Sequence, residues 1–128
     1  MRLREHEFLP LGAQRREVDN REWVKCHLMC GVNTRIVSAV DVGGWTANDT
    51  NYFVPLVERT AAHFGTREVS ADKAYLSHKN LEAVEGLGGI PFIPFKSNTL
   101  EPTKAGTWAK MYHLFAYERD AFMERYHK

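Results

Sequence analysis

The stretch Glu68-Val69-Ser70-Ala71-Asp72-Lys73-Ala74-Tyr75 decides how the rest of the chain is arranged. A run of small and β-branched residues leads directly into Asp72, which predicts a buried strand that ends at a carboxylate. Ser77 then offers a helix start. An acid at the carboxyl end of a strand, just before a helix, lies where open α/β sheets bind ligands and metals. The alternative is that Asp72 only caps the turn or helix that follows it.

Composition indicates one soluble domain. The chain has 128 residues, of which 44% are hydrophobic and 26% charged, as in ordinary globular proteins. No apolar run approaches the roughly 20 residues of a membrane helix. Residues 1–7 are too charged for a signal peptide. These features predict a cytoplasmic protein without a membrane partner.

The two cysteines are expected to be reduced thiols. Cys26 and Cys30 lie on the same predicted strand, about 13 Å apart at the usual rise per residue. That distance is too long for a disulfide. A zinc site with His27 is the alternative, but the strand period places His27 on the opposite face from both cysteines, and no second ligand pair follows.

The first half of the chain divides into an arm and a hairpin. Residues 1–20 are predicted to form an irregular charged arm, broken by Pro10 and Gly12, with a short strand near Phe8. Residues 23–32 and 35–42 then predict two strands. The short connection between them makes an antiparallel hairpin.

The second half alternates helices with strands. Apolar spacing predicts helices near residues 50–64, 77–87 and 108–126. Between the last two helices, residues 90–96 form an extended apolar run whose prolines indicate an edge strand. A hairpin followed by strand–helix units is an α/β pattern.

Four separate motifs stand out in the sequence. They are Arg21-Glu22-Trp23-Val24-Lys25-Cys26-His27-Leu28-Met29-Cys30-Gly31, then Ala71-Asp72-Lys73-Ala74-Tyr75, then Ile93-Pro94-Phe95-Lys96-Ser97-Asn98, and the closing residues Trp108, Met111-Tyr112-His113, Phe122-Met123 and Tyr126-His127-Lys128. Together they resemble the catalytic domain of insertion-sequence transposases, a family of the D…D…E type. They occur in the family's order over residues 21–128, which predicts a partial transposase catalytic domain there.

The resemblance implies a ribonuclease-H-like mixed sheet flanked by helices, and metal-dependent cleavage and joining of DNA. In such enzymes three carboxylates hold two divalent ions, Mg²⁺ or Mn²⁺, that activate the attacking oxygen and stabilise the leaving one. Asp72 matches the second of these acids, and is therefore the candidate catalytic and metal-binding residue.

The other two acids have no match in this chain. The family's first acid lies on a strand well upstream of the one that begins near Trp23, and Asp19 is too close to that strand. The third acid lies beyond the Tyr-His-Lys motif that ends at Lys128. We therefore expect an inactive internal piece of a transposase, from a truncated or decayed gene or a displaced reading frame, with at most weak Mg²⁺ binding.

The missing segment should also affect folding. The ribonuclease-H-like sheet has the strand order third, second, first, fourth, fifth. Without the first strand, the hairpin and the strand before Asp72 would have unpaired edges inside the sheet. We expect an incomplete domain in which residues 8–11 substitute poorly, with marginal stability and a tendency to associate.

DNA is the partner that the resemblance implies, as transposon ends and as target. Candidate phosphate contacts are Lys73, Lys96, Lys104 and Lys110, although exposed lysines often serve only solubility. The net charge of +1 shows no global basic field, so DNA binding needs a local patch. A second copy or a full-length transposase is a further expected partner. The alternative function is a non-catalytic module that binds DNA or transposase.

Overall fold

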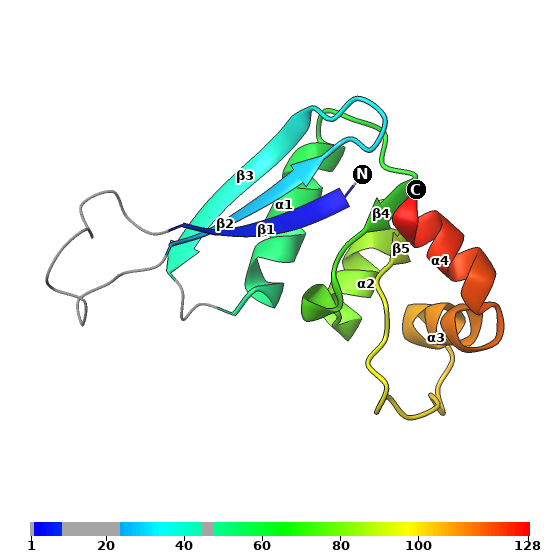
Figure 1. Cartoon of the computed structure of the whole chain (residues 1–128). Coiled ribbons are helices and arrows are strands. Elements are labelled where there is room, and N and C mark those ends of the chain that lie inside the picture. Colours follow the sequence, from blue (N-terminus) through cyan, green and yellow to red (C-terminus); the bar gives the residue numbers. More distant parts are fainter. Residues whose placement is uncertain (1, 9–23, 45–47) are drawn as a thin grey trace, which may run out of the picture.

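The computed structural model describes residues 2–8, 24–44 and 48–128, which form a five-stranded mixed sheet with helices around it (Figure 1). The strands are β1 (Arg2–Phe8), β2 (Val24–Cys30), β3 (Val37–Gly44), β4 (Glu68–Ser70) and β5 (Ile90–Phe92). Their order across the sheet is β3-β2-β1-β4-β5. The pairs β1–β2 and β2–β3 are antiparallel, and the pairs β1–β4 and β4–β5 are parallel. This is the strand order that the resemblance implies.

Strand β1 corrects the expectation that the first strand is missing. All of β1 pairs with β2, from Arg2 opposite Cys30 to Phe8 opposite Val24, and Arg2 also pairs with Ser70 of β4. The predicted irregular arm is therefore wrong for residues 2–8, and so is the gap inside the sheet. The predicted boundary near residue 20, and the substitute strand beyond Phe8, lie outside the described residues.

The predicted hairpin is confirmed, because β2 and β3 pair along their length with one irregularity near Met29 and Cys30. Side chains alternate across β2 as expected. His27 and Met29 are fully buried, whereas Cys26 and Cys30 are half-buried free thiols on the other face.

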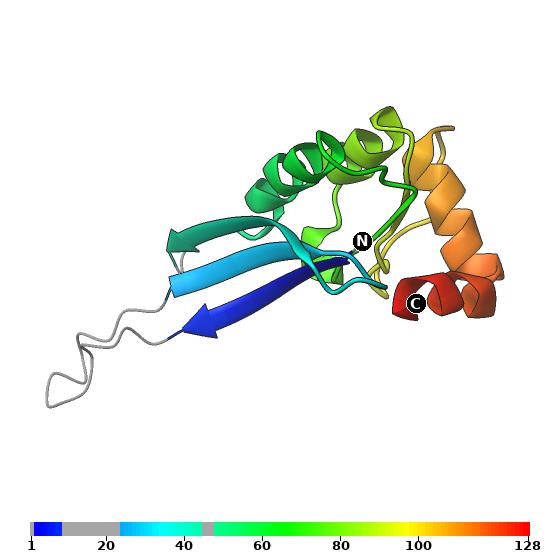
Figure 2. The same cartoon turned by 90° about the horizontal axis from the view of Figure 1, so that it is seen from above.

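The helices are α1 (Thr50–Ala61), the short 3₁₀ helix η2 (Lys73–Tyr75), α2 (His78–Gly86), α3 (Thr107–Tyr117) and α4 (Arg119–His127). The predicted helices near 50–64 and 77–87 correspond to α1 and α2. Figures 1 and 2 show α1 and α2 on one side of the sheet and α4 on the other side, next to β4 and β5. None of the helices in the described residues is long and apolar enough to cross a membrane.

The predicted helix over 108–126 is instead two helices that meet at Glu118. Glu118 leaves the helical region, with φ −124° and ψ 49°, and ends α3 as α4 begins. The turn brings the Phe122 ring to 5.0 Å from that of Phe115. In one straight helix these residues would be about 10 Å apart along the axis. Burial of Phe122 in the core, also against Phe92, therefore stabilises the break.

The main core lies between the sheet and the helices. Its largest fully buried side chains include Tyr75, Phe53, Phe122, Met29, Leu56 and Leu81. Pro55 lies inside α1, within about one turn of its start, where a proline is tolerated.

Candidate functional site

Asp72 lies two residues beyond the end of β4, at the carboxyl end of a strand that is parallel to both of its neighbours. Its side chain is exposed, and its Oδ1 accepts a hydrogen bond of 3.0 Å from the backbone N–H of Ala74. Asp72 is thereby the N-cap of η2. The strand-end position and the capping role, which the sequence presented as alternatives, are both present.

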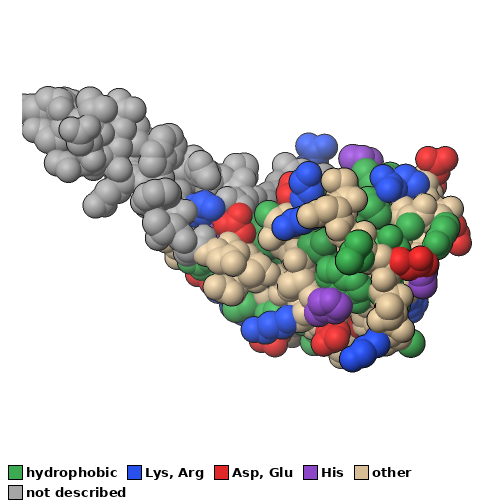
Figure 3. All heavy atoms as spheres, turned by 90° about the horizontal axis from the view of Figure 1, so that it is seen from below, with side chains coloured by type: hydrophobic (Ala, Val, Ile, Leu, Met, Phe, Trp, Pro, Cys, Tyr) green, Lys and Arg blue, Asp and Glu red, His purple; other side chains and the backbone are tan. Residues whose placement is uncertain are grey.

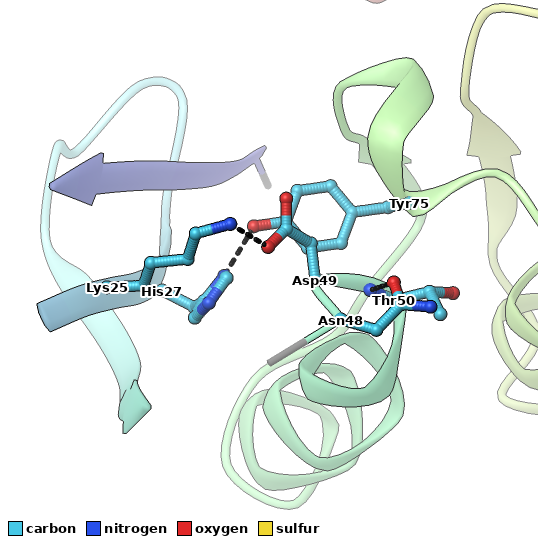
Figure 4. Close-up of polar contacts among 6 residues, drawn as sticks. All are labelled: Lys25, His27, Asn48, Asp49, Thr50 and Tyr75. Atoms are coloured by element: carbon cyan, nitrogen blue, oxygen red, sulfur yellow. Dashed lines mark hydrogen bonds and ion pairs between the residues drawn. The ribbon is translucent and has the colours of Figure 1, made fainter. Parts of the chain in front are cut away.

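Tyr75 anchors the segment that follows Asp72. Its side chain is 1% exposed, and its hydroxyl lies 2.7 Å from Nδ1 of His27 on β2 (Figure 4). Tyr75 is therefore a core residue whose hydroxyl has a polar partner. The contact joins η2 to the middle of the sheet.

His27 is fully buried and stacks on the ring of Tyr52, with 4.3 Å between ring centroids. Burial has the largest effect on the pKa of His27 and lowers it. Asp49 and Asp41 raise this pKa and Lys25 lowers it, each to a smaller extent. Its Nε2 atom is buried and makes no hydrogen bond with the described residues. A neutral imidazole, which contacts the Tyr75 hydroxyl through Nδ1, is the form that this environment favours.

Lys25 and Asp49 form an ion pair beside this contact, with 2.8 Å between Nζ and Oδ1. Asp49 is at the N-cap position of α1 but makes no side-chain cap there. Figure 4 shows the pair between β2 and the start of α1. Asp49 therefore pairs with the sheet, across 24 residues of the chain, a contact that the sequence analysis missed.

Asn80 connects the same segment to two helices. It is 1% exposed, and its Nδ2 lies 2.7 Å from the carbonyl oxygen of Tyr75 and 2.8 Å from Oγ1 of Thr50. These contacts hold α2, the start of α1 and the end of η2 together. The position of Asp72 therefore depends on a buried polar network around Tyr75.

Two of the predicted DNA-contacting lysines are brought together. Lys104 and Lys110 line one cavity of about 420 Å³, together with Gly106 and His113, at the start of α3. The N-terminus of a helix favours anions, because its first N–H groups are unpaired and its dipole is positive there. Lys73, in η2, and Lys96, after β5, are exposed and do not line this cavity.

Figure 3 shows the molecule from below, the side on which the chain between β5 and α3 lies in Figure 1. Hydrophobic side chains gather near the centre of this face, and lysine and arginine side chains lie around them. Glu101 lies in the loop between β5 and α3 and attaches this loop to α3. It accepts a 3.2 Å hydrogen bond from the Tyr117 hydroxyl and lies 3.6 Å from Nε2 of His113. The loop that carries Lys104 is thus held against α3.

The described residues do not fit a pair of divalent ions. Within residues 2–8, 24–44 and 48–128, no group of three histidine, cysteine, aspartate or glutamate residues is placed to hold a metal. His27 lies on the opposite face of β2 from Cys26 and Cys30, as predicted, so these three side chains do not converge on one point. Asp72 is a suitable hard oxygen ligand, but one carboxylate cannot bridge two ions and complete their shells.

Comparison with known proteins identifies the family. The family model described as Transposase DDE domain matches residues 5–125. Neither the curated proteins nor the solved structures contain a significant match to the chain. The matched region extends from within β1 to within α4 and includes Asp72 and the two lysines, Lys104 and Lys110, of the cavity at the start of α3. The family generally uses divalent metal ions and acts on DNA. This chain belongs to the transposase DDE domain family.

Proposed function

We propose that the chain is a ribonuclease-H-like catalytic domain of a DDE transposase in which Asp72 is the second acid, and that residues 1–128 alone neither cleave nor join DNA. The observation that carries this proposal is the position of Asp72. It follows β4, whose neighbour β1 occupies the centre of the sheet, in a chain that belongs to the family.

The inactivity of residues 1–128 follows from the metal requirement. Phosphodiester transfer by two ions needs carboxylates from several elements. Strand β1 contains Glu5 and Glu7 but no aspartate, and the resemblance places the third acid after Lys128. We infer that Asp72 contributes one ligand of a centre that these residues do not complete.

The second candidate function is a non-catalytic module that binds DNA or a full-length transposase. The α3 cavity favours DNA binding, because Lys104, Lys110 and the helix N-terminus present positive charge to one space. Phosphate contacts of this kind supply most of the affinity of non-specific DNA binding. This function does not require Asp72.

A nicking assay on supercoiled plasmid tests the proposal. With Mg²⁺ or Mn²⁺, residues 1–128 should produce no more nicked or joined product than the Asp72→Ala variant. A longer protein that supplies two further acids should cleave, and Asp72→Ala should abolish that cleavage while DNA binding persists. Robust nicking by residues 1–128 that survives Asp72→Ala would place the chemistry elsewhere and overturn the proposal.

A further inference from the structure

A second basic cavity lies alongside β4. Its volume is about 410 Å³, which is in the range of roughly 300–1,000 Å³ found for ligand sites. The turn after β2, the residues around the start of β4 and the end of α4 form its walls. Figures 1 and 2 show that this turn and the end of α4 lie close together. Arg67 precedes β4, and the cavity extends to Ser70 at the end of that strand, but Asp72 does not line it.

The walls of this cavity carry a surplus of positive charge. Arg67, Arg125 and Lys128 line it together with one acidic side chain, that of Glu68, and residues 1–128 also carry the terminal carboxylate of Lys128 there. Nη1 of Arg125 lies 2.9 Å from Oε1 of Glu68, which holds this guanidinium in place. Neither Arg67 nor Lys128 forms an ion pair with another described residue. Arg67 is therefore the cation that a ligand can engage without breaking an ion pair, and Lys128 adds a second ammonium group beside its own terminal carboxylate.

The preference of helix C-termini for cations explains part of this arrangement. Arg125 and Lys128 lie at the end of α4, where they complement the negative end of the helix dipole. Arg67 comes from a different segment and has no such role. Because Arg67 lines the same cavity as Arg125 and Lys128, the helix end alone does not explain the positive charge there.

We propose that this cavity binds a phosphate group. The planar guanidinium of Arg67 matches two phosphate oxygens, and Lys128 adds a point charge. Asn33, in the turn after β2, and Ser70, which is 5% exposed, line the same cavity and carry neutral donors. The phosphate comes from a DNA backbone or from a small phosphorylated molecule. The recognition chemistry is the same for both.

Heteronuclear NMR titration of residues 1–128 with inorganic phosphate, against NaCl at equal ionic strength, tests this site. The amides of Asn33, Gly65 and Ser70 should shift saturably. Arg67→Gln, which breaks no ion pair of the described residues, should weaken binding about tenfold, as expected for one charge-assisted hydrogen bond. Lys79→Gln, at an exposed position on α2, is the matched control and should leave binding unchanged.

A second titration with a short DNA duplex identifies the source of the phosphate. Shifts at the same three amides that inorganic phosphate reverses identify the DNA backbone. Binding of phosphate without a DNA effect there identifies a small phosphorylated ligand. The absence of saturable shifts, or equal affinity in the parent and Arg67→Gln proteins, would overturn the proposal. Because Asp72 is not involved, either result leaves the proposed catalytic role to be judged separately.

Discussion

The Nδ1 atom of His27 lies 2.7 Å from the hydroxyl oxygen of Tyr75, and this buried contact ties β2 to the turn that Asp72 begins. The two residues are 48 positions apart in the chain. Their contact links two of the motifs that resemble transposases, one on the hairpin and one around Asp72. The position of the candidate acid is therefore held by the core of the sheet.

Removing the Tyr75 hydroxyl should destabilise the domain. Tyr75→Phe leaves Nδ1 of His27 buried without this partner, at a cost of about 1–3 kcal/mol in the free energy of unfolding. Urea unfolding at pH 7.5 measures the change. Tyr117→Phe is the control, because it removes an exposed hydroxyl hydrogen bond, the one to Glu101, and should cost less than about 0.5 kcal/mol. Equal effects of the two changes would mean that the His27 contact contributes nothing.

Acidification should destabilise the domain through His27. Burial lowers the pKa of His27 below its usual 6.5, so between these two values the unfolded chain binds more protons than the folded one. This contribution to stability is complete above pH 6.5 and is lost as the pH falls toward the folded pKa. Urea midpoints at pH 7.5 and 5.5 should therefore differ more for the parent protein than for His27→Gln. Identical pH dependence in both proteins would show that His27 does not cause the loss of stability at low pH.

Loss of the Asn80 hydrogen bonds should lower the stability of the domain and loosen η2 and α2 together. Asn80→Ala removes the donor to the Tyr75 carbonyl and to Thr50, and should cost about 1–3 kcal/mol. Hydrogen exchange should accelerate at the start of α2 and in η2 together. Asn98→Ala, at an exposed loop position, serves as the control. A change confined to α2 would show that the network does not couple these elements.

The α3 cavity should contribute phosphate contacts. Lys104→Gln and Lys110→Gln should each weaken duplex DNA binding and reduce the slope of log affinity against log salt by about 0.9. Fluorescence anisotropy across a salt series measures both quantities, with Lys79→Gln as the control. An unchanged salt slope in both lysine variants would exclude this cavity from the DNA interface.

The sequence predicted those parts of the fold whose pattern is local. The hairpin follows from alternation along β2 and β3, and the position of Asp72 follows from the short buried run that precedes it. The break at Glu118 was not predictable, because it depends on Phe122 packing back against Phe115. The apolar stripe of α3 and α4 has the same spacing whether or not the helix turns.

Strand β1 was missed because its composition is unlike that of a central strand. Strands with neighbours on both sides are usually apolar, whereas Arg2–Phe8 contains four charged residues and one histidine. Its pairing with β2 and β4 is a long-range property that local patterns do not show. The contacts of His27, Asp49 and Asn80 were missed for the same reason, since each joins segments that are distant in the chain.

Binding of Mn²⁺, followed by paramagnetic broadening of amide signals, tests most directly whether Asp72 is the metal-binding acid. Residues 1–128 should bind Mn²⁺ weakly, with broadening centred on residues 71–75. Asp72→Asn keeps the capping oxygen for Ala74 but removes the charge, and should abolish this broadening. Asp120→Asn, at an exposed aspartate of α4, should leave it intact. Broadening that is centred elsewhere, or that persists in Asp72→Asn, would contradict the role assigned to Asp72.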